Sequence, residues 1–469
     1  MNIECLREFN LESPGIKHVR SAPVNLGDGK EGVLFVYSYD SIDPGEEYYH
    51  HPKDTLKIAV YTAEGKRLWV KDLGEGVIPG IWFCPVLPLD LDCDGVDEIY
   101  FVNNINPNAP LSFVYRKLES LSPLTGETIG RWDWPQNTFN ERLSLCYRFY
   151  LIAGYSNGKP VLITSQGTYG NMYLQGYGPG MEKKWDIVIP ADEPGPRASH
   201  LTPVLDFNND GIDELFWGER LISVEDGHEV ICYDRDAYEG HSDIIIPFLN
   251  FETKERFLFT CREGADEANV PRVVCFNEDG SHAWNALDEG HMHYGWLATV
   301  KNGDGYRRVV MAMKLVQHFG ENALTVDDKV EYYFDAFTGE ILDWSLPCKG
   351  SKVVPVDING DGYSEFFCAE GDDIGWFFDS DGNKLFKIKE SFEPREGVQV
   401  KNGWILKDYP CEQVMIACED GKVRIYGDTE AKGSEIFNFR QTYKGYHAFA
   451  QKLMATGYNH YRSNVSCGI

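Results

Sequence analysis

Short runs of β-branched and aromatic residues, separated by clusters of glycine, aspartate and asparagine, make up most of the sequence. Helical periodicity, in which apolar residues recur three and four positions apart, is scarce. Short apolar runs bounded by turn-forming residues are typical of strands joined by tight turns. The pattern therefore predicts an all-β protein.

A strand, a turn that ends in glycine, and a second strand that often closes on tryptophan recur along the chain. The first copies run from Ile58 through Gly65 to Trp69 and from Leu121 through Gly126 to Trp132. Consecutive turn glycines are 43 to 61 residues apart, and a strand-rich unit repeated about every 50 residues is typical of a β-propeller. The copies predict eight blades over residues 1–437, with 438–469 closing on the propeller as part of the same domain. The turn glycines are Gly65, Gly126, Gly180, Gly227, Gly280, Gly339, Gly382 and, in a weaker copy, Gly433.

Three acidic stretches of identical spacing lie between these hairpins. Each has Asp or Asn at positions 1, 3 and 5, Gly at 6 and Glu at 9. Oxygen ligands at this spacing, with a glycine that lets the backbone turn, wrap a hard cation such as Ca²⁺. An EF-hand loop differs because its last ligand is a Glu at position 12 and its flanks are helices. We therefore expect an eight-bladed β-propeller with calcium-binding D-x-[DN]-x-D-G loops, the alternative being acidic turns without an ion. The expected ligands are Asp90, Asp92, Asp94, Asp97, Glu98, Asp206, Asn208, Asp210, Asp213, Glu214, Asp357, Asn359, Asp361 and Glu365.

The inner strand of each propeller blade runs along the central channel, so residues that start these strands should converge at one mouth. Most of the residues at these positions are basic or imidazole groups, although the net charge of the chain is −29. A local reversal of charge indicates a pocket for an anionic ligand, with carboxylate as the obvious candidate. Each residue taken singly could instead be a solvated loop residue. The set comprises His18, Arg20, Trp82, Tyr147, Arg148, His200, His241, His291, His293, Tyr294, Lys352 and Arg395.

The overall charge argues against nucleic acid or an anionic membrane as a partner, because both attract basic surfaces. The N-terminus lacks the basic and apolar regions of a secretion signal, and no apolar run of about 18 residues suggests a membrane span. The 12 cysteines form no C-x-x-C pair. These features predict a cytoplasmic protein with reduced cysteines, and nothing in the sequence indicates an oligomeric state.

From about Arg142 to the C-terminus the chain resembles the β-propeller of the rhamnogalacturonan lyases of polysaccharide lyase family 11. Lys159 to Tyr169, followed by Lys184-Trp185, is similar to that family's R-P-x-L-V-x-x-R-G-Y-Y and K-x-W segments. Ser199-His200 before the second acidic loop is similar to its N-H-N segment. Three further similarities are Gly240-His241-Ser242-Asp243 with G-H-G-D, Gly350-Ser351-Lys352 with N-G-T-K, and Gln451 to Asn459 with the tail segment that ends in Y-N.

The resemblance implies calcium as a cofactor, an active cleft at the propeller mouth and an anionic oligosaccharide as substrate. It further implies that Lys352 is catalytic, that Tyr458 contacts the substrate, and that His200 and His241 line the cleft. One departure is clear: Met292 to Trp296 stands where the family has D-V-G-R-G, so the family's arginine is absent.

β-Elimination at a uronate needs a cation against the carboxylate, a base for the C5 proton and an acid for the leaving oxygen. We therefore hypothesise a lyase that cleaves rhamnose-uronate linkages of short, imported oligosaccharides. A non-catalytic carbohydrate- or protein-binding propeller is the alternative. A quinone-dependent dehydrogenase ranks third, because Phe334 to Trp344 resembles the D-x-x-T-G-x-x-x-W motif of those enzymes. The expected catalytic residues are Lys352, His241, His293 and Tyr294, and the expected substrate-binding residues are Arg148, His200, Tyr458, Arg262 and Arg20.

Overall fold

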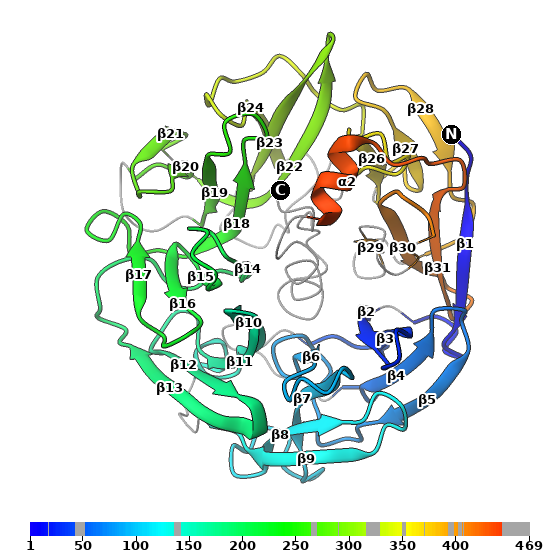
Figure 1. Ribbon diagram of the computed structural model, residues 1–469, viewed down its shortest axis with the longest axis vertical. Helices are drawn as coiled ribbons and strands as arrows, with labels where there is room; N and C mark the ends of the chain where they lie inside the picture. Colours follow the sequence, from blue (N-terminus) through cyan, green and yellow to red (C-terminus); the bar gives the residue numbers. More distant parts are fainter. Residues whose placement is uncertain are drawn as a thin grey trace, which may run out of the picture.

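The computed structural model describes residues 1–16, 18–42, 52–135, 142–263, 270–288, 290–315, 329–348, 353–369, 371–392, 398–401, 406 and 408–442. The described strands form eight antiparallel sheets, arranged as blades around a central axis (Figure 1). Seven sheets have four strands and one has three within the described residues. The predicted all-β, eight-bladed β-propeller is confirmed.

The first four blades follow the chain in order, each from an inner to an outer strand. Blade 1 comprises β2 (His18–Asn25), β3 (Glu31–Ser38), β4 (Lys57–Thr62) and β5 (Arg67–Asp72), and blade 2 comprises β6 (Val86–Leu89), β7 (Glu98–Asn104), β8 (Arg116–Leu121) and β9 (Thr128–Asp133). Blade 3 comprises β10 (Phe149–Ser156), β11 (Lys159–Gln166), β12 (Met172–Gly178) and β13 (Glu182–Ile189), and blade 4 comprises β14 (Val204–Leu205), β15 (Glu214–Trp217), β16 (Arg220–Ser223) and β17 (Glu229–Cys232).

The remaining blades complete the ring, and short helices lie between blades 2 and 3, within blade 3 and after blade 8. Blade 5 comprises β18 (Ser242–Leu249), β19 (Arg256–Arg262), β20 (Val273–Asn277) and β21 (His282–Ala286), and blade 6 comprises β22 (His291–Asn302), β23 (Gly305–Leu315) and β24 (Lys329–Asp335). Blade 7 comprises β25 (Val353–Val356), β26 (Glu365–Cys368), β27 (Trp376–Phe378) and β28 (Lys384–Lys387), and blade 8 contains β29 (Val398–Lys401), β30 (Gln413–Ala417) and β31 (Lys422–Asp428). The helices are α1 (Leu143–Cys146), η1 (Pro179–Met181) and α2 (Glu435–Thr442).

The ring closes through β1 (Ile3–Asn10), which is the outermost strand of blade 8. It pairs with β31 from Ile3 opposite Asp428 to Asn10 opposite Lys422. The first and last parts of the chain therefore share one sheet, and the N-terminal strand lies beside the last blade in Figure 1. The repeat pattern alone had not assigned this strand to a blade.

Trp69, Trp185, Trp284 and Trp344 each connect their blade to the next one. The indole Nε1 of Trp69 donates to the carbonyl of Pro123 over 2.7 Å, and that of Trp284 donates to Ala336 over 2.9 Å. The turn glycine of the receiving blade lies directly against the indole: a Cβ on Gly339 would come within 2.6 Å of the Trp284 ring. The Gly and Trp of the sequence repeat are therefore the two sides of one inter-blade contact.

The direction of the inner strands gives the propeller two distinct faces. In blades 2 and 4 the inner strand runs from a mouth residue to the first residue of an acidic loop, as β14 does between His200 and Asp206. The mouth and the acidic loops consequently lie at opposite ends of the blades. Among the described residues, no helix is long and apolar enough to cross a membrane.

Candidate functional site

The structure brings four histidines from three blades together around a single carboxylate, Asp243. His200 precedes β14, His241 precedes β18, and His291 and His293 lie at the start of β22. Asp243 is the second residue of β18 and is 3% exposed. We call these five residues the mouth cluster.

Two β-bulges aim the central residues of this cluster. The register between β18 and β19 shifts between Ser242 and Ile244, so Asp243 is the extra residue. The register between β22 and β23 shifts between Met292 and Tyr294, so His293 is the extra residue there. A bulge turns a side chain out of the regular alternation of a strand. The two bulges therefore bring Asp243 and His293 into contact across neighbouring blades.

The imidazoles contact different oxygens of Asp243. His200 Nε2 and His241 Nε2 each lie 3.2 Å from Oδ1. On the other side, His291 Nε2 lies 3.1 Å from Oδ2, and His293 Nδ1 also contacts Oδ2. Burial by itself would raise the pKa of Asp243, but the surrounding imidazoles hold that pKa well below its usual range. Asp243 is therefore a carboxylate anion.

Second partners fix which nitrogen of two histidines carries a proton. His241 Nδ1 contacts the carbonyl oxygen of Ala198, which can only accept, so Nδ1 carries a proton and Nε2 faces Asp243. Arg148 Nη1 lies 3.1 Å from His200 Nδ1, and a guanidinium can only donate. Neutral His200 therefore carries its proton at Nε2 and directs it at Asp243.

Aromatic rings surround the cationic side of the cluster. The Arg148 guanidinium lies over Trp82 at 4.9 Å and over Tyr169 at 5.0 Å, measured to the ring centroids. The Tyr169 ring is 4.9 Å from that of His241, and burial raises the pKa of its hydroxyl. Burial and the neighbouring His241 also hold the pKa of His200 well below its ordinary value, so His200 is neutral.

Arg20 is a further cation at the mouth end of blade 1. Its Nη2 donates to the carbonyl of Cys84 over 2.9 Å, whereas its buried Nη1 has no hydrogen-bond partner among the described residues. Burial lowers its pKa to about 10, which still leaves the group charged at neutral pH. Within the described part of the chain, Arg20 forms no ion pair, so it is a cation able to accept an anionic ligand.

Two residues expected to contact substrate are held in buried contacts beside the cluster. Arg262 is 0% exposed and donates through Nε to Glu219 over 2.9 Å and through Nη2 to Asp234 over 2.7 Å. Arg262 is linked to the mouth through Glu219, because Ser242 Oγ, next to His241 and Asp243, donates to the same carboxylate. Tyr294 packs into the apolar cluster that includes Trp296. Contact of either residue with substrate would require these buried contacts to open. Lys352, Arg395 and Tyr458 lie outside the described residues.

The three acidic loops share one geometry at the opposite face. In each loop the position-6 glycine donates its backbone N–H to the position-1 aspartate: Gly95 to Asp90, Gly211 to Asp206 and Gly362 to Asp357, all over 3.0 Å. In the first loop, oxygen atoms of Asp90, Asp92, Asp94 and Glu98 lie within 4.8 Å of one another. In the third, buried Glu365 Oε2 has no hydrogen-bond partner among the described residues. These oxygens fit a Ca²⁺ ion, which prefers clustered carboxylates.

The position-8 residues of these loops hold neighbouring blades together. Asp97 Oδ2 accepts the backbone N–H of Asn25 over 2.7 Å, and Asp213 Oδ2 accepts that of Tyr155 over 2.8 Å. Ser364 serves the same purpose in the third loop, accepting from Thr299 over 3.2 Å. Asp97 and Asp213, which were expected as calcium ligands, therefore each direct an oxygen at the preceding blade.

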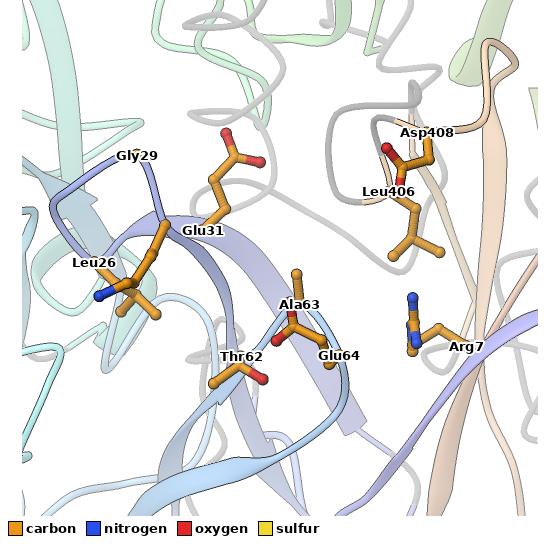
Figure 2. Close-up of a pocket in the computed structure, with 10 residues that line it drawn as sticks. Arg7, Leu26, Gly29, Glu31, Thr62, Ala63, Glu64, Leu406 and Asp408 are labelled. Carbon is orange, nitrogen blue, oxygen red and sulfur yellow. The ribbon is translucent and has the colours of Figure 1, made fainter.

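A pocket of about 540 Å³ opens between blades 8 and 1 on the acidic-loop face. Figure 2 shows Arg7 and three acids, Glu31, Glu64 and Asp408, around it. These groups mix both charges and contribute no imidazole. The pocket is therefore separate from the mouth cluster.

Asp243 and Tyr169 were not among the expected site residues. Two polar groups, His241-x-Asp243 and His291-x-His293, stand at the same spacing in the sequence. That spacing, at the start of two neighbouring inner strands, was the available signal. For Tyr169 the available signal was its place at the end of the segment from Lys159 that is similar to R-P-x-L-V-x-x-R-G-Y-Y.

No protein-family model and no curated protein matches the sequence. Similar solved structures include the exotype rhamnogalacturonan lyase YesX, with a TM-score of 0.74, 17% identity, and coverage of 98% of this chain and 83% of that chain. The Bacillus licheniformis rhamnogalacturonan lyase PL11 has a TM-score of 0.72 at 17% identity, with coverage of 97% and 80%, and rhamnogalacturonan lyase YesW has 0.71 at 16%, with 97% and 81%. At the level of its fold, the chain is an eight-bladed β-propeller of the kind found in the rhamnogalacturonan lyases.

Proposed function

We propose that the protein is a lyase that cleaves glycosidic bonds next to uronic acid residues by β-elimination at the propeller mouth. The observation that carries the proposal is the convergence of guanidinium and imidazole groups from blades 1, 3, 4, 5 and 6 at one end of a propeller with net charge −29. The likeness to solved rhamnogalacturonan lyases supports rhamnose-uronate oligosaccharides as the substrate class.

Arg20 is the proposed partner of the substrate carboxylate. Its buried Nη1 lacks a partner among the described residues, so binding a carboxylate would supply a missing hydrogen bond and a counter-charge. Neutralising the carboxylate makes the C5 proton more acidic, and this effect grows as negative charge develops in the transition state. Arg148 adds positive potential from below the surface, where the two aromatic rings hold it.

His241 is the proposed base. The Ala198 carbonyl fixes a proton on Nδ1, so Nε2, which lies 3.2 Å from Asp243 Oδ1, is the nitrogen that would accept the C5 proton. The Tyr238 hydroxyl donates to the His241 carbonyl over 2.6 Å and Ser242 is tied to Glu219, which fixes the backbone on both sides of the imidazole. A base held in this way meets the substrate in a single orientation.

Calcium is the proposed ion of the three acidic loops. Asp90, Asp92, Asp94 and Glu98 would hold it in the first loop, and the position-1, 3, 5 and 9 residues would do so in the other two. Because the loops lie at the face opposite the mouth, this calcium would stabilise the propeller and would not take part in the reaction.

The described cysteines are free thiols, which supports a reducing compartment. We propose the cytoplasm, where imported oligosaccharides rather than long polymers would be the substrates. Comparing turnover of short and long rhamnogalacturonan chains tests this point, and faster turnover of the polymer would contradict it.

The function is tested by following unsaturated uronide formation from rhamnogalacturonan oligosaccharides with the native protein, Arg20→Met and His241→Ala. We expect Arg20→Met to lower kcat/KM by about 10- to 100-fold, the value of one charge-assisted hydrogen bond. We expect His241→Ala to lower kcat by about 100-fold or more, as for loss of a general base. Arg235→Met is the matched control, because Arg235 pairs with Glu193 on the outer side of blade 4. Unchanged kinetics in both mouth variants would refute the assignment, and binding without turnover by the native protein would indicate a non-catalytic propeller.

A further inference from the structure

The hydroxyl of Tyr169 lies at the mouth and makes no hydrogen bond among the described residues. The residue is only partly exposed, so the protein holds its ring while the hydroxyl can still reach a ligand. Two nearby tyrosines differ in this respect. The Tyr150 hydroxyl donates to the Ser199 carbonyl over 3.2 Å, and the Tyr238 hydroxyl donates to the His241 carbonyl over 2.6 Å. Tyr169 therefore differs from both in having a hydroxyl available to a substrate.

The turn after β11 sets the position of Tyr169. Gly167 has a φ of 91°, which favours glycine, and its N–H donates to the Arg148 carbonyl over 3.1 Å. Thr168 is 0% exposed, and its Oγ1 lies 3.1 Å from the Tyr150 hydroxyl oxygen. These contacts fix the backbone immediately before Tyr169.

Two contacts orient the Tyr169 ring. The Arg148 guanidinium lies over the ring, 5.0 Å from its centroid. The His241 ring meets it edge-on, with a centroid distance of 4.9 Å and an interplanar angle of 70°. The phenol therefore lies beside the proposed base. Burial raises the pKa of the Tyr169 hydroxyl, so this group is protonated at neutral pH and can donate its proton.

Arg20, the proposed partner of the substrate carboxylate, belongs to the same series of contacts. Its Nη2 donates to the carbonyl of Cys84 over 2.9 Å, and Cys84 follows Trp82 by two residues. The Arg148 guanidinium lies 4.9 Å from the centroid of the Trp82 ring and also covers Tyr169. The cation, the phenol and the base are therefore neighbours at the mouth, as elimination at one uronate requires.

We propose that Tyr169 is the catalytic acid that protonates the leaving sugar oxygen. This assignment rests on the proposed function and supplies the third group that elimination needs. His241 takes the C5 proton, the electron pair of that bond forms the C4=C5 double bond, and the C4–O bond breaks as the leaving oxygen takes the Tyr169 proton. Water then carries a proton from His241 back to the phenolate, so no water is consumed and no oxidant or reductant is required.

The test compares two substrates with the native full chain and with Tyr169→Phe, and follows unsaturated uronide formation. One substrate is a rhamnogalacturonan oligosaccharide, whose leaving sugar needs a proton. In the other, 4-nitrophenol replaces that sugar at C4 of the uronate, and 4-nitrophenolate leaves without a proton. We expect Tyr169→Phe to lower kcat by about 100-fold or more on the oligosaccharide, as for loss of a general acid, and by less than about 5-fold on the nitrophenyl substrate.

Tyr306→Phe is the matched control, because Tyr306 lies near the start of β23 on the acidic-loop face, and it should change neither rate. Phenylalanine at position 169 keeps the ring, and cooperative urea unfolding of each variant checks that the fold is retained. The assignment is overturned if Tyr169→Phe is as active as the native protein on the oligosaccharide. It is also overturned if the variant loses as much on the nitrophenyl substrate, which is the result of a purely structural role. A native protein that forms no unsaturated product from either substrate refutes the proposed function itself, and the assignment with it.

Discussion

Replacing Glu214 by glutamine should change the stability of the calcium-free protein in opposite directions at low and high pH. Glu214 closes the second acidic loop and is 1% exposed. Burial, together with the charges of Asp210 and Asp206, raises its pKa from 4.5 to about 8. The unfolded chain therefore loses this proton at lower pH than the folded protein does. Its contribution to stability is complete below pH 4.5 and is lost as the pH rises to about 8.

The difference between the two pKa values corresponds to about 5 kcal/mol at full effect. Relaxation of the ion-free loop and penetration of water reduce this to the order of 2 kcal/mol. Glutamine is neutral at every pH and can still accept the Phe207 N–H, which donates to Glu214 over 2.8 Å. Glutamine loses the hydrogen bond that Asn208 Nδ2 donates to Glu214 Oε1, which is worth about 1 kcal/mol. In chelator we therefore expect Glu214→Gln to be about 1 kcal/mol more stable than the native protein above about pH 8 and about 1 kcal/mol less stable near pH 5.

Urea unfolding followed by tryptophan fluorescence, with chelator or with Ca²⁺, measures both effects. Added Ca²⁺ should reverse the order at high pH, because the variant has lost a charged ligand. Glu182→Gln, at an exposed position at the start of β13, should show neither effect. A Glu214→Gln protein that is less stable than the native one at both pH values in chelator would refute the reasoning. So would equal stabilisation of both proteins by Ca²⁺.

Two further substitutions test the scaffold. Arg262→Met leaves the fully buried Glu219 carboxylate without its guanidinium, so urea unfolding should show a loss of about 3–5 kcal/mol in the free energy of unfolding. The control, Arg235→Met, changes a 39% exposed position and should cost less than about 1 kcal/mol. A loss below about 1 kcal/mol for Arg262→Met would show that the pair is not a support of the mouth. Gly339→Ala and Gly29→Ala place alanine at φ values of 72° and 71°, but only the first Cβ would meet a tryptophan, Trp284 of the preceding blade. Thermal unfolding should therefore show the larger decrease in Tm for Gly339→Ala, and equal decreases would contradict the proposed inter-blade contact.

Much of the fold could be predicted from the sequence because the repeated contacts use distinctive residues. A turn glycine such as Gly339 and a closing tryptophan such as Trp284 form one inter-blade contact, so their spacing marks the blades. The acidic loops were visible for a similar reason, since local spacing alone sets their geometry. The N-terminal strand was not assigned because its partner, β31, is separated from it by nearly the whole chain.

The site was only partly predictable because two β-bulges, at Asp243 and His293, determine its geometry. The predicted convergence placed His200, His241, His291 and His293 at one mouth, as the structure shows. The bulge at Asp243 arises from the pairing between β18 and β19, so the local sequence pattern does not predict it.

Arg262 shows a second thing that the sequence does not reveal, which is whether a charged residue is already paired. A basic residue at a strand end is compatible with a substrate contact, but it pairs with Glu219, which lies 43 positions away. Only the folded structure shows that this charge is already neutralised. The sequence could therefore identify which residues reach the mouth region, but not which of them remain available to a ligand.

The most direct test of the proposed chemistry is to identify the product that the native protein forms from rhamnogalacturonan oligosaccharides. Elimination at a uronate predicts a new chain end that carries an unsaturated uronide, detected by its ultraviolet absorbance and by a product mass without added water. A saturated uronic acid end, with the mass of one added water, would show hydrolysis and contradict the lyase account.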